Sequence, residues 1–278
     1  MSKSKYRTIT VKRSEKITPN MQRVAFSGDD LADFPADYEG GYVRLYFSDR
    51  GEAIAEESQL QASSNFPRVY TVRGFDRAAS ELTIDFSLHG KKNGPGATWA
   101  NASKPGERIL MAGPGMSKRV NNQADWFLFV GDMAGLPALS SSLEQLPDTA
   151  RGYAAIEVMS EADRQELKVP AGIDVKWIVN DRPGENTDVL TNEIKSINWD
   201  SGKPFIWVAC EFNSMKKVRQ YLNDERNVDR DNLYISSYWK FGRTDEEHRI
   251  DKRQDANVPF PLKMIWGIQA QCKKLGWF

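Results

Sequence analysis

The sequence has few of the residues on which several classes of protein depend. It contains two cysteines, Cys210 and Cys272, and two histidines, His89 and His248. These four residues cannot by themselves complete a well-spaced structural zinc site, and two cysteines do not make a disulfide framework. We therefore expect no metal centre.

The chain also lacks an excess of charge and a long hydrophobic run. Lysine plus arginine and aspartate plus glutamate each total 38, so no overall field favours nucleic acid or an acidic membrane. No apolar run reaches the ~18 residues that cross a bilayer, and none follows the basic N-terminal residues as in a signal peptide. We expect a soluble, cytoplasmic protein with neither a nucleic-acid nor a membrane partner.

The apolar residues that are present can fill two cores. The chain has 278 residues, 40% of them hydrophobic, and this length fits two domains of roughly 100–200 residues each. Within residues 1–122, short alternating segments separated by turns are typical of an antiparallel β-barrel or sandwich. The expected strands span 6–12, 22–27, 41–48, 66–74, 81–88 and 108–111, and the Glu-containing stretch 51–64 predicts a solvated excursion.

The pattern changes at Trp126. Residues 126–130 form a continuous apolar run, as in a parallel strand buried on both faces. Further short apolar runs follow, separated by helical or loop segments, at 153–159, 175–179, 205–209 and 233–236. Strands that alternate with helices indicate a parallel sheet with crossovers. We place the boundary so that a β-barrel domain spans 1–122 and an α/β domain with a helical tail spans 123–278.

The first candidate site is the segment 68–73, Arg-Val-Tyr-Thr-Val-Arg. Side chains alternate faces along a strand, so Arg68 and Tyr70 should point one way and Thr71 the other. A guanidinium can bind a pyrophosphate through two hydrogen bonds, a phenol can lie on a flat heterocycle, and a hydroxyl can hydrogen-bond a ring nitrogen. The combination suits a flavin dinucleotide, and an ordinary strand is the alternative interpretation.

A second candidate site follows Leu88 and His89. A Gly-Pro-Gly turn that leads into a helix brings backbone N–H groups together, where the helix dipole favours an anion. An ordinary loop before a helix is the alternative, and His89 is as compatible with a structural place as with one beside a flavin. The candidate residues are Gly94, Pro95, Gly96, Ala97, Thr98 and Trp99.

Strand ends in the second domain carry further candidates, because open parallel sheets bind ligands beyond the carboxyl ends of their strands. The turn after residues 126–130 is not a Gly-x-Gly-x-x-Gly fingerprint, which disfavours a Rossmann dehydrogenase. Core packing is the alternative for Cys210. The candidates are Gly131, Asp132, Leu136, Pro137, Cys210, Glu211, Tyr238 and Trp239.

Taken in order, these motifs resemble one family, the siderophore-interacting proteins, which are FAD-dependent ferric-siderophore reductases of the ferredoxin-reductase superfamily. The resemblance implies an antiparallel FAD-binding β-barrel followed by a parallel-sheet nucleotide-binding domain. The matching stretches are Arg68-Val-Tyr70-Thr71, His89-Gly90 with Gly94-Pro95 and Trp99-Ala100, Pro105-Gly106, Ala112-Gly113-Pro114-Gly115, Gly131-Asp132 with Leu136-Pro137-Ala138, Leu143-Glu144 with Leu146-Pro147, and Tyr238-Trp239 with Gly242.

The resemblance also implies roles for the candidate residues. Arg68, Tyr70 and Thr71 would hold the FAD phosphate and isoalloxazine, with Arg73 and the Leu88-His89 strand end beside them. The turn 94–98 would hold the pyrophosphate, and Trp99 would fix the helix behind it. NADH or NADPH would bind at the strand ends of the α/β domain.

Three departures from the family pattern bear on the nucleotide site. The family usually has Thr-Ala-Leu-Pro where residues 134–137 are Ala-Gly-Leu-Pro, so a hydroxyl is lost. It has Ala-Gly-Glu where residues 209–211 are Ala-Cys-Glu, and Tyr-Trp-Arg-Arg-Gly where residues 238–242 are Tyr-Trp-Lys-Phe-Gly.

The implied reaction is the reduction of a ferric siderophore through FAD, with iron released as Fe(II). Hydride carries two electrons whereas Fe(III) accepts one, and a flavin can pass electrons singly, so no protein residue need act as nucleophile or general acid. Ferric siderophores are commonly anionic, so we expect a cationic vestibule, although each cation could instead be a solvated surface charge. The candidates are Arg44, Lys118, Arg119, Lys240 and Arg243.

The electron donor stays open among NADH, NADPH and a ferredoxin. The acidic residues that follow the segment 153–159 disfavour a 2′-phosphate, whereas Ser160 and Arg164 could bind one. Three other functions remain as alternatives: a ferredoxin-reductase-like flavin oxidoreductase with another acceptor, a non-catalytic siderophore-binding protein, and a flavin-dependent sensor.

Overall fold

The structure is a computed structural model that describes residues 5–48, 50–60, 66–88, 94–115, 120 and 123–257. The chain forms two compact units that divide between Phe241 and Gly242. In its described part the second unit is one helix, α5 (Asp245–Asn257), in which Arg249 pairs with Asp245 at 2.6 Å. No helix within the described residues is long and apolar enough to cross a membrane.

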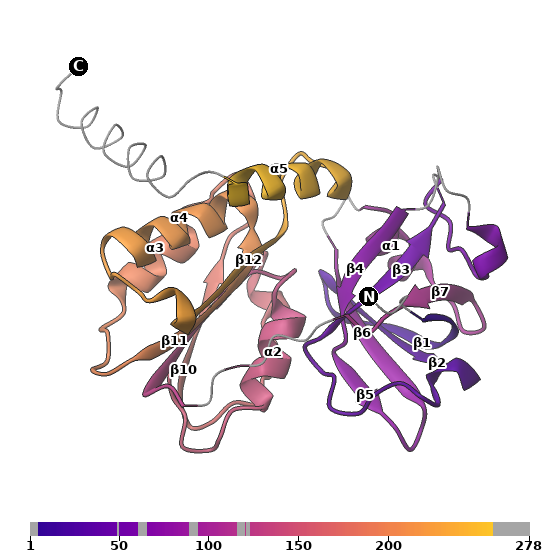
Figure 1. Ribbon diagram of the computed structural model, residues 1–278, viewed down its shortest axis with the longest axis horizontal. Helices are drawn as coiled ribbons and strands as arrows, with labels where there is room; N and C mark the ends of the chain where they lie inside the picture. The colour runs from indigo at the N-terminus through magenta and orange to yellow at the C-terminus, as the bar shows by residue number, and fades with distance from the viewer. Residues whose placement is uncertain are drawn as a thin grey trace. The chain divides into compact units, whose positions relative to one another are not determined.

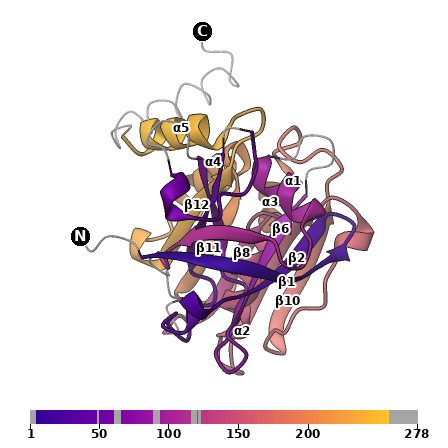
Figure 2. The same ribbon diagram turned by 90° about the vertical axis from the view of Figure 1, so that its right-hand side faces the viewer.

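The first part of the larger unit is a seven-stranded antiparallel sheet with the order β4-β3-β7-β1-β2-β6-β5 (Figures 1 and 2). The sheet curls like a barrel without closing. Just beyond β4, the N–H of Arg73 donates to the carbonyl of Thr83 on β6 at 2.9 Å, which brings the two sides of the sheet together. The strands are β1 (Tyr6–Thr18), β2 (Met21–Ser27), β3 (Tyr42–Phe47), β4 (Phe66–Thr71), β5 (Gly74–Asp76), β6 (Glu81–Ser87) and β7 (Arg108–Ala112).

Alternating apolar residues build the interior of this barrel. On β3, Val43, Leu45 and Phe47 are fully buried, and the residues between them are not. Helix α1 (Pro95–Ala102) adds Trp99, whose ring lies 6.1 to 6.3 Å from three buried phenylalanine rings. Each such large apolar side chain stabilises the fold by about 1.5–3 kcal/mol when it leaves water.

Part of the stretch predicted as a solvated excursion is packed against the barrel. Ile54 is buried, its N–H donates to the carbonyl of Tyr46 at 3.0 Å, and its carbonyl accepts from the N–H of Leu110 at 2.6 Å. The prediction was wrong here because the surrounding glutamates, which are exposed, dominate the local composition while one isoleucine decides the packing.

The second part of the larger unit is a five-stranded parallel sheet with the order β10-β9-β8-β11-β12. The chain runs outwards from β8 in one direction and then in the other, so the topological switch point lies between β8 and β11. The predicted order of an antiparallel barrel followed by a parallel α/β sheet is confirmed. The strands are β8 (Trp126–Gly131), β9 (Arg151–Val158), β10 (Gly172–Val179), β11 (Pro204–Glu211) and β12 (Leu233–Trp239).

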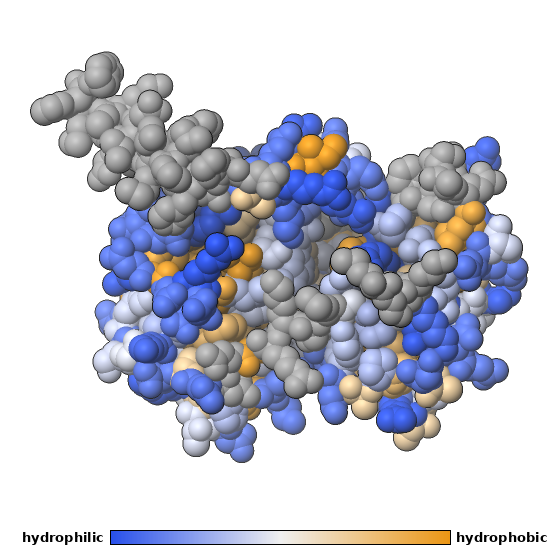
Figure 3. Space-filling model, in the orientation of Figure 1, coloured by the Kyte–Doolittle hydropathy of each residue, from blue (hydrophilic) through white to orange (hydrophobic). Residues whose placement is uncertain are grey.

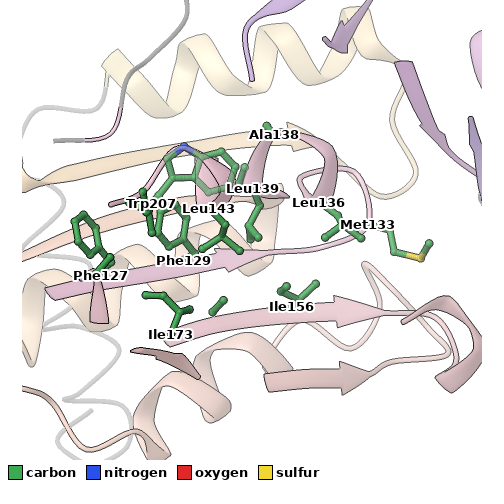
Figure 4. Close-up of a cluster of buried hydrophobic side chains, with 14 of the residues drawn as sticks. Phe127, Phe129, Met133, Leu136, Ala138, Leu139, Leu143, Ile156, Ile173 and Trp207 are labelled. Carbon is green, nitrogen blue, oxygen red and sulfur yellow. The ribbon is translucent and has the colours of Figure 1, made fainter. Parts of the chain in front are cut away.

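Helices cover both faces of the parallel sheet, so every residue of β8 is buried. Figure 4 shows Leu139 and Leu143 of α2 packed against Phe129 and Trp207 of the sheet. On the face shown in Figure 3, hydrophobic residues form only small separate patches, because most of them lie in these cores. The helices are α2 (Leu136–Glu144) on one face, and α3 (Val189–Ser196) and α4 (Phe212–Asp224) on the other.

The β1–β2 hairpin joins the barrel to the α/β part. Met21, at the start of β2, is buried within the core that α2 and the parallel sheet form. Beside it, the fully buried Asp163 accepts hydrogen bonds from the Thr18 hydroxyl, from the N–H and side-chain amide of Asn20, and from the Ser160 hydroxyl, at 2.7 to 3.0 Å. Burial alone would raise the pKa of Asp163, but these hydrogen bonds outweigh it and the pKa is lowered.

Candidate functional site

The segment 68–73 forms β4 and its exit, at one end of the antiparallel sheet. Arg68 lies opposite Leu45 and Tyr70 opposite Val43. Because directly paired residues share a face, Arg68 and Tyr70 lie on the inner face of the barrel edge. The ring of Tyr70 is 4.4 Å from that of Phe86, and both Arg68 and Tyr70 are half-buried.

The tyrosine on this face reaches the N-terminus of α1. A Cβ at Gly96, in the first turn of α1, would collide with the Tyr70 hydroxyl, so only glycine lets the two meet. Gly94 is the N-cap residue of α1 and, as a glycine, provides no side-chain cap for the first N–H groups of the helix. The β4 face that carries the Arg68 guanidinium therefore adjoins a helix N-terminus whose N–H groups and dipole favour an anion.

The remaining candidates around β4 and α1 have mainly structural neighbours. Thr71 is buried on the opposite face of β4 from Tyr70. Arg73 forms two hydrogen bonds with Glu144 of α2, at 2.6 and 3.2 Å. Leu88 is buried and its N–H donates to the carbonyl of Asn20 at 2.9 Å. His89 lies outside the described residues, and Ala97, Pro95 and Thr98 belong to the first turn and a half of α1.

At the carboxyl ends of the parallel strands, the carboxylate of Asp132 holds the turn after β8 through hydrogen bonds. One oxygen of its carboxylate accepts from the N–H groups of Ala134 and Gly135, both at 3.0 Å. The other accepts from the N–H of Glu211 at 2.8 Å and from the Trp239 indole at 2.7 Å. The carboxylate thus spans the switch point between β8 and β11. Burial raises the pKa of Asp132 to about 6, although these hydrogen bonds act to lower it.

Gly135 explains one departure of this turn from the family pattern. A Cβ there would collide with the backbone carbonyl of Ala209 on β11. Glycine therefore lets the turn lie directly on the neighbouring strand. Leu136 and Pro137, which follow, are the buried first residues of α2.

Of the other strand-end candidates, Glu211 lies at the carboxyl end of its strand and Cys210 lies in the core. Glu211 caps α4 by accepting from the N–H groups of Asn213 at 2.5 Å and Ser214 at 3.0 Å. Cys210 is fully buried among residues of α3 and α4, and burial raises the pKa of its thiol well above the usual value. Burial likewise raises the pKa of Tyr238.

One residue near the carboxyl ends of these strands was not among the sequence candidates. Glu157, near the end of β9, is 4% exposed, and its Oε1 accepts from the Asn180 side chain at 3.0 Å. Burial, followed by the charge of Asp132, raises its pKa to about 8. The signal available in the sequence was a single acidic residue within the apolar run 153–159.

Three of the five candidate cations, Arg44, Lys240 and Arg243, lie within the described residues. The Arg44 guanidinium lies over the Tyr42 ring at 5.2 Å on the outer face of β3, and the Lys240 ammonium lies over the Phe212 ring at 4.5 Å. Arg243 belongs to the second compact unit, where it pairs with Glu247 and Asp251 at 3.5 Å. Lys118 and Arg119 lie outside the described residues. In the part of the chain that the structure covers, no group of acidic, His or Cys residues could hold a metal ion.

Two family models match successive parts of the chain. Residues 10–118 match the siderophore-interacting FAD-binding domain, and residues 124–242 match the siderophore-interacting protein domain. The ferric vibriobactin reductase ViuB of Vibrio cholerae is 30% identical over 249 residues, which cover 86% of this chain and 91% of ViuB. The chain belongs to the siderophore-interacting protein family.

Other members of this family and their relatives agree with the assignment. The crystal structure of SipS, the siderophore-interacting protein of Aeromonas hydrophila, superposes with a TM-score of 0.80 at 30% identity, covering 92% of this chain and 99% of SipS. The NADPH-dependent ferric-chelate reductase of Escherichia coli is 26% identical over 245 residues, covering 84% of this chain and 93% of that protein.

The residues of the barrel edge fit the FAD that this domain type binds. The Arg68 guanidinium is the kind of group that binds a pyrophosphate through two hydrogen bonds. The N-terminus of α1 offers backbone N–H groups, and Gly96 lets the Tyr70 hydroxyl lie against its first turn. Tyr70 shares the face of Arg68, and its half-buried ring packs against that of Phe86.

Proposed function

We propose that this siderophore-interacting protein is an FAD-dependent reductase that passes electrons from NADH, NADPH or a ferredoxin to a ferric siderophore and releases iron as Fe(II). The observation that carries the proposal is the barrel edge, where the Arg68 and Tyr70 face of β4 meets Gly96 at the N-terminus of α1. It lies within the stretch that matches an FAD-binding domain.

The residues of this edge would bind and orient the cofactor. Arg68 and the α1 turn Gly94–Thr98 would hold the pyrophosphate, while Tyr70 would contact the isoalloxazine, with Trp99 anchoring α1 in the barrel core. Thr71, which was also predicted to bind the flavin, is buried on the opposite face of β4, so its side chain would support the strand instead. When bound, the flavin supplies the exchange between a two-electron hydride and the single electron that Fe(III) accepts.

The donor nucleotide would lie along the carboxyl ends of β8, β11 and β12, the usual place in an open parallel sheet. The Asp132 turn and Trp239 lie at these carboxyl ends and are joined by a hydrogen bond, and Glu211 caps α4 beside them. The N–H groups of Ala134 and Gly135 are already occupied by Asp132, so a pyrophosphate would need other partners here.

The ferric siderophore would be attracted by cations near the flavin edge. Arg44 and Lys240 are the described candidates of the first unit, with Lys118, Arg119 and Arg243 as further ones. We also propose that the functional division of the chain falls between residues 122 and 123, and that the protein acts in the cytoplasm, which cell fractionation would test.

The proposal is tested with purified protein under anaerobic conditions. We expect the protein to be yellow with FAD, and the photoreduced protein to release Fe(II) from a panel of ferric siderophores into a colorimetric trap. The double variant Arg68→Ala, Tyr70→Ala should lose the flavin. Arg77→Ala, which removes an exposed cation of the same domain, should keep it. A wild-type protein that takes up no FAD would overturn the proposal, and one that binds ferric siderophores without flavin would be a carrier instead.

A further inference from the structure

Strand β10 forms one edge of the parallel sheet. Its eight residues pair with β9 in a register without shifts, and no other strand of the described residues pairs with it. The strand at the opposite edge, β12, is less regular, because its register against β11 shifts between Cys210 and Glu211. The regular edge of this sheet is therefore β10.

Alternate backbone groups of β10 point away from the sheet. The N–H of Asn180, directly after the strand, donates to the carbonyl of Val158 on β9 at 2.8 Å. The backbone groups of successive residues point to opposite sides of a strand, so those of Val175 and Trp177 point away from β9. Among the described residues, none forms a hydrogen bond with these outward groups. Such a row of unpaired groups is a template for another strand.

β10 lacks the features with which exposed edge strands usually avoid pairing, namely shortness, proline, a bulge or a net charge. The strand contains no proline and no bulge against β9. Its two charged residues, Asp174 and Lys176, lie on one face and pair with each other at 2.9 Å, so the strand carries no net charge. At its end, the hydrophobic side of Val179 is 42% exposed.

The charges of β10 are complementary to those of a second, antiparallel β10. If Val175 lies opposite Val175 of the other copy, Asp174 of each copy lies opposite Lys176 of the other. Opposite charges at directly facing positions stabilise a pair of strands, and like charges destabilise it. Pairing Val175 with Ile173 or Trp177 instead would set Asp174 against Asp174 or Lys176 against Lys176. Among these registers, the charges favour the one that is symmetric about Val175.

The backbone supports the same register. The outward groups of Val175 would be exchanged between the two copies, as in a hydrogen-bonded pair of antiparallel strands. The outward N–H of Trp177 would donate to the carbonyl of Ile173 in the other copy, whose own N–H already donates to the carbonyl of Pro170 at 3.0 Å. The half-buried Trp177 ring would lie beside the Ile173 side chain of the other copy, and such aromatic and β-branched pairs stabilise a sheet.

We propose that two copies of this protein pair antiparallel along β10, about a two-fold axis at Val175, and form a homodimer with one continuous sheet. A two-fold axis brings the same surface of both copies together, as in most homodimers. In the sheet order, β9 and β8 separate β10 from the switch point between β8 and β11. The pairing therefore does not use that part of the sheet, and it is independent of the proposed electron transfer.

The test is sedimentation velocity of the full-length protein at concentrations from about 1 to 200 µM. We expect wild type to dimerise with a dissociation constant on the order of 10 µM, as for a small interface. Asp174→Lys and Lys176→Asp, each of which sets like charges opposite one another, should each weaken dimerisation about tenfold or more. The double variant, which exchanges the two charges, should restore it to within about threefold of wild type. Lys217→Asp, which breaks an ion pair with Asp188 outside β10, should dimerise as wild type does.

A backbone variant tests the pairing without changing a charge. Val175→Pro removes the N–H at the two-fold axis, which makes no bond to β9, and edge strands tolerate proline at such positions. This variant should stay monomeric over the same range, with circular dichroism as the measure of folding.

Three results would overturn the inference. The first is wild-type protein that is monomeric at about 200 µM, which would leave the β10 edge to a segment of this chain or to another protein. The second is a dimer that neither single charge reversal weakens, which would place the interface elsewhere. The third is a double variant that dimerises as weakly as the single ones, which would exclude the register. If Val175→Pro does not fold, the charge variants decide the matter alone.

Discussion

Replacement of Glu157 by glutamine should make the protein more stable, and increasingly so as the pH rises. The Glu157 carboxyl is 4% exposed, and its pKa rises from 4.5 to about 8 on folding, through burial and then the charge of Asp132. A raised pKa means that the folded state binds the proton more tightly than the unfolded state does. The folded protein therefore loses stability as the pH rises from the unfolded pKa to the folded one.

The magnitude follows from these two pKa values. The linkage relation gives a loss of about 1 kcal/mol at pH 5, about 3 kcal/mol at pH 7 and about 5 kcal/mol at pH 9, relative to a side chain that does not titrate. Glutamine has the shape of the protonated acid and can still accept the Asn180 hydrogen bond through its amide oxygen. The Glu157→Gln variant should therefore gain these amounts.

Urea unfolding of both proteins, followed by tryptophan fluorescence at pH 5, 7 and 9, measures the difference. Glu166→Gln, a change at an exposed glutamate of the same domain, is the matched control and should alter stability by less than about 0.5 kcal/mol at each pH. The reasoning is refuted if the gain at Glu157 is the same at pH 5 and pH 9, or if wild type is the more stable protein at pH 9.

Three further predictions concern the junction, the turn and the acceptor site. Asp163→Ala leaves four donors without their shared acceptor and should destabilise the protein by about 3–5 kcal/mol in urea unfolding, with Asp163→Asn losing less than half of that; equal losses would contradict the hydrogen-bond account. Gly135→Ala should cost about 1–3 kcal/mol because its Cβ meets a β11 carbonyl, whereas Gly74→Ala, with open space around it, should cost less than about 1 kcal/mol. Charge reversal in Arg44→Glu and Lys240→Glu should raise the KM for an anionic ferric siderophore about three- to tenfold, with little change for a neutral chelate. Unchanged kinetics would contradict the prediction of a cationic vestibule.

The strands could be predicted from the sequence because the evidence for them is local. Alternation at Val43, Leu45 and Phe47 marks a barrel strand, and the continuous run in β8 marks a strand covered on both faces. The shared face of Arg68 and Tyr70 follows from the same period of two. That Tyr70 meets Gly96 depends on how α1 packs into the barrel, and no local pattern contains that information.

The features that could not be predicted depend on contacts between distant segments. The pKa of Glu157 is raised by burial that only the assembled sheet provides, and then by the charge of Asp132, 25 positions earlier. Cys210 was a candidate because it ends a strand, but its side chain lies on the α3 and α4 face of the sheet. Asp163 looked like one acid in a charged turn, and its role depends on a hairpin that precedes it by more than 140 residues.

The hairpin that carries Met21 also sets the order in which the protein can be completed during synthesis. β1 and β2 leave the ribosome first, yet β1 pairs with β7, and Met21 finds its packing partners among residues between 127 and 209. At ~5–20 residues per second, the last of these partners emerges roughly 10–40 s after the hairpin. Met21 is thus covered long after the strand that carries it has been made, and the barrel expressed alone would leave this side chain without its packing partners.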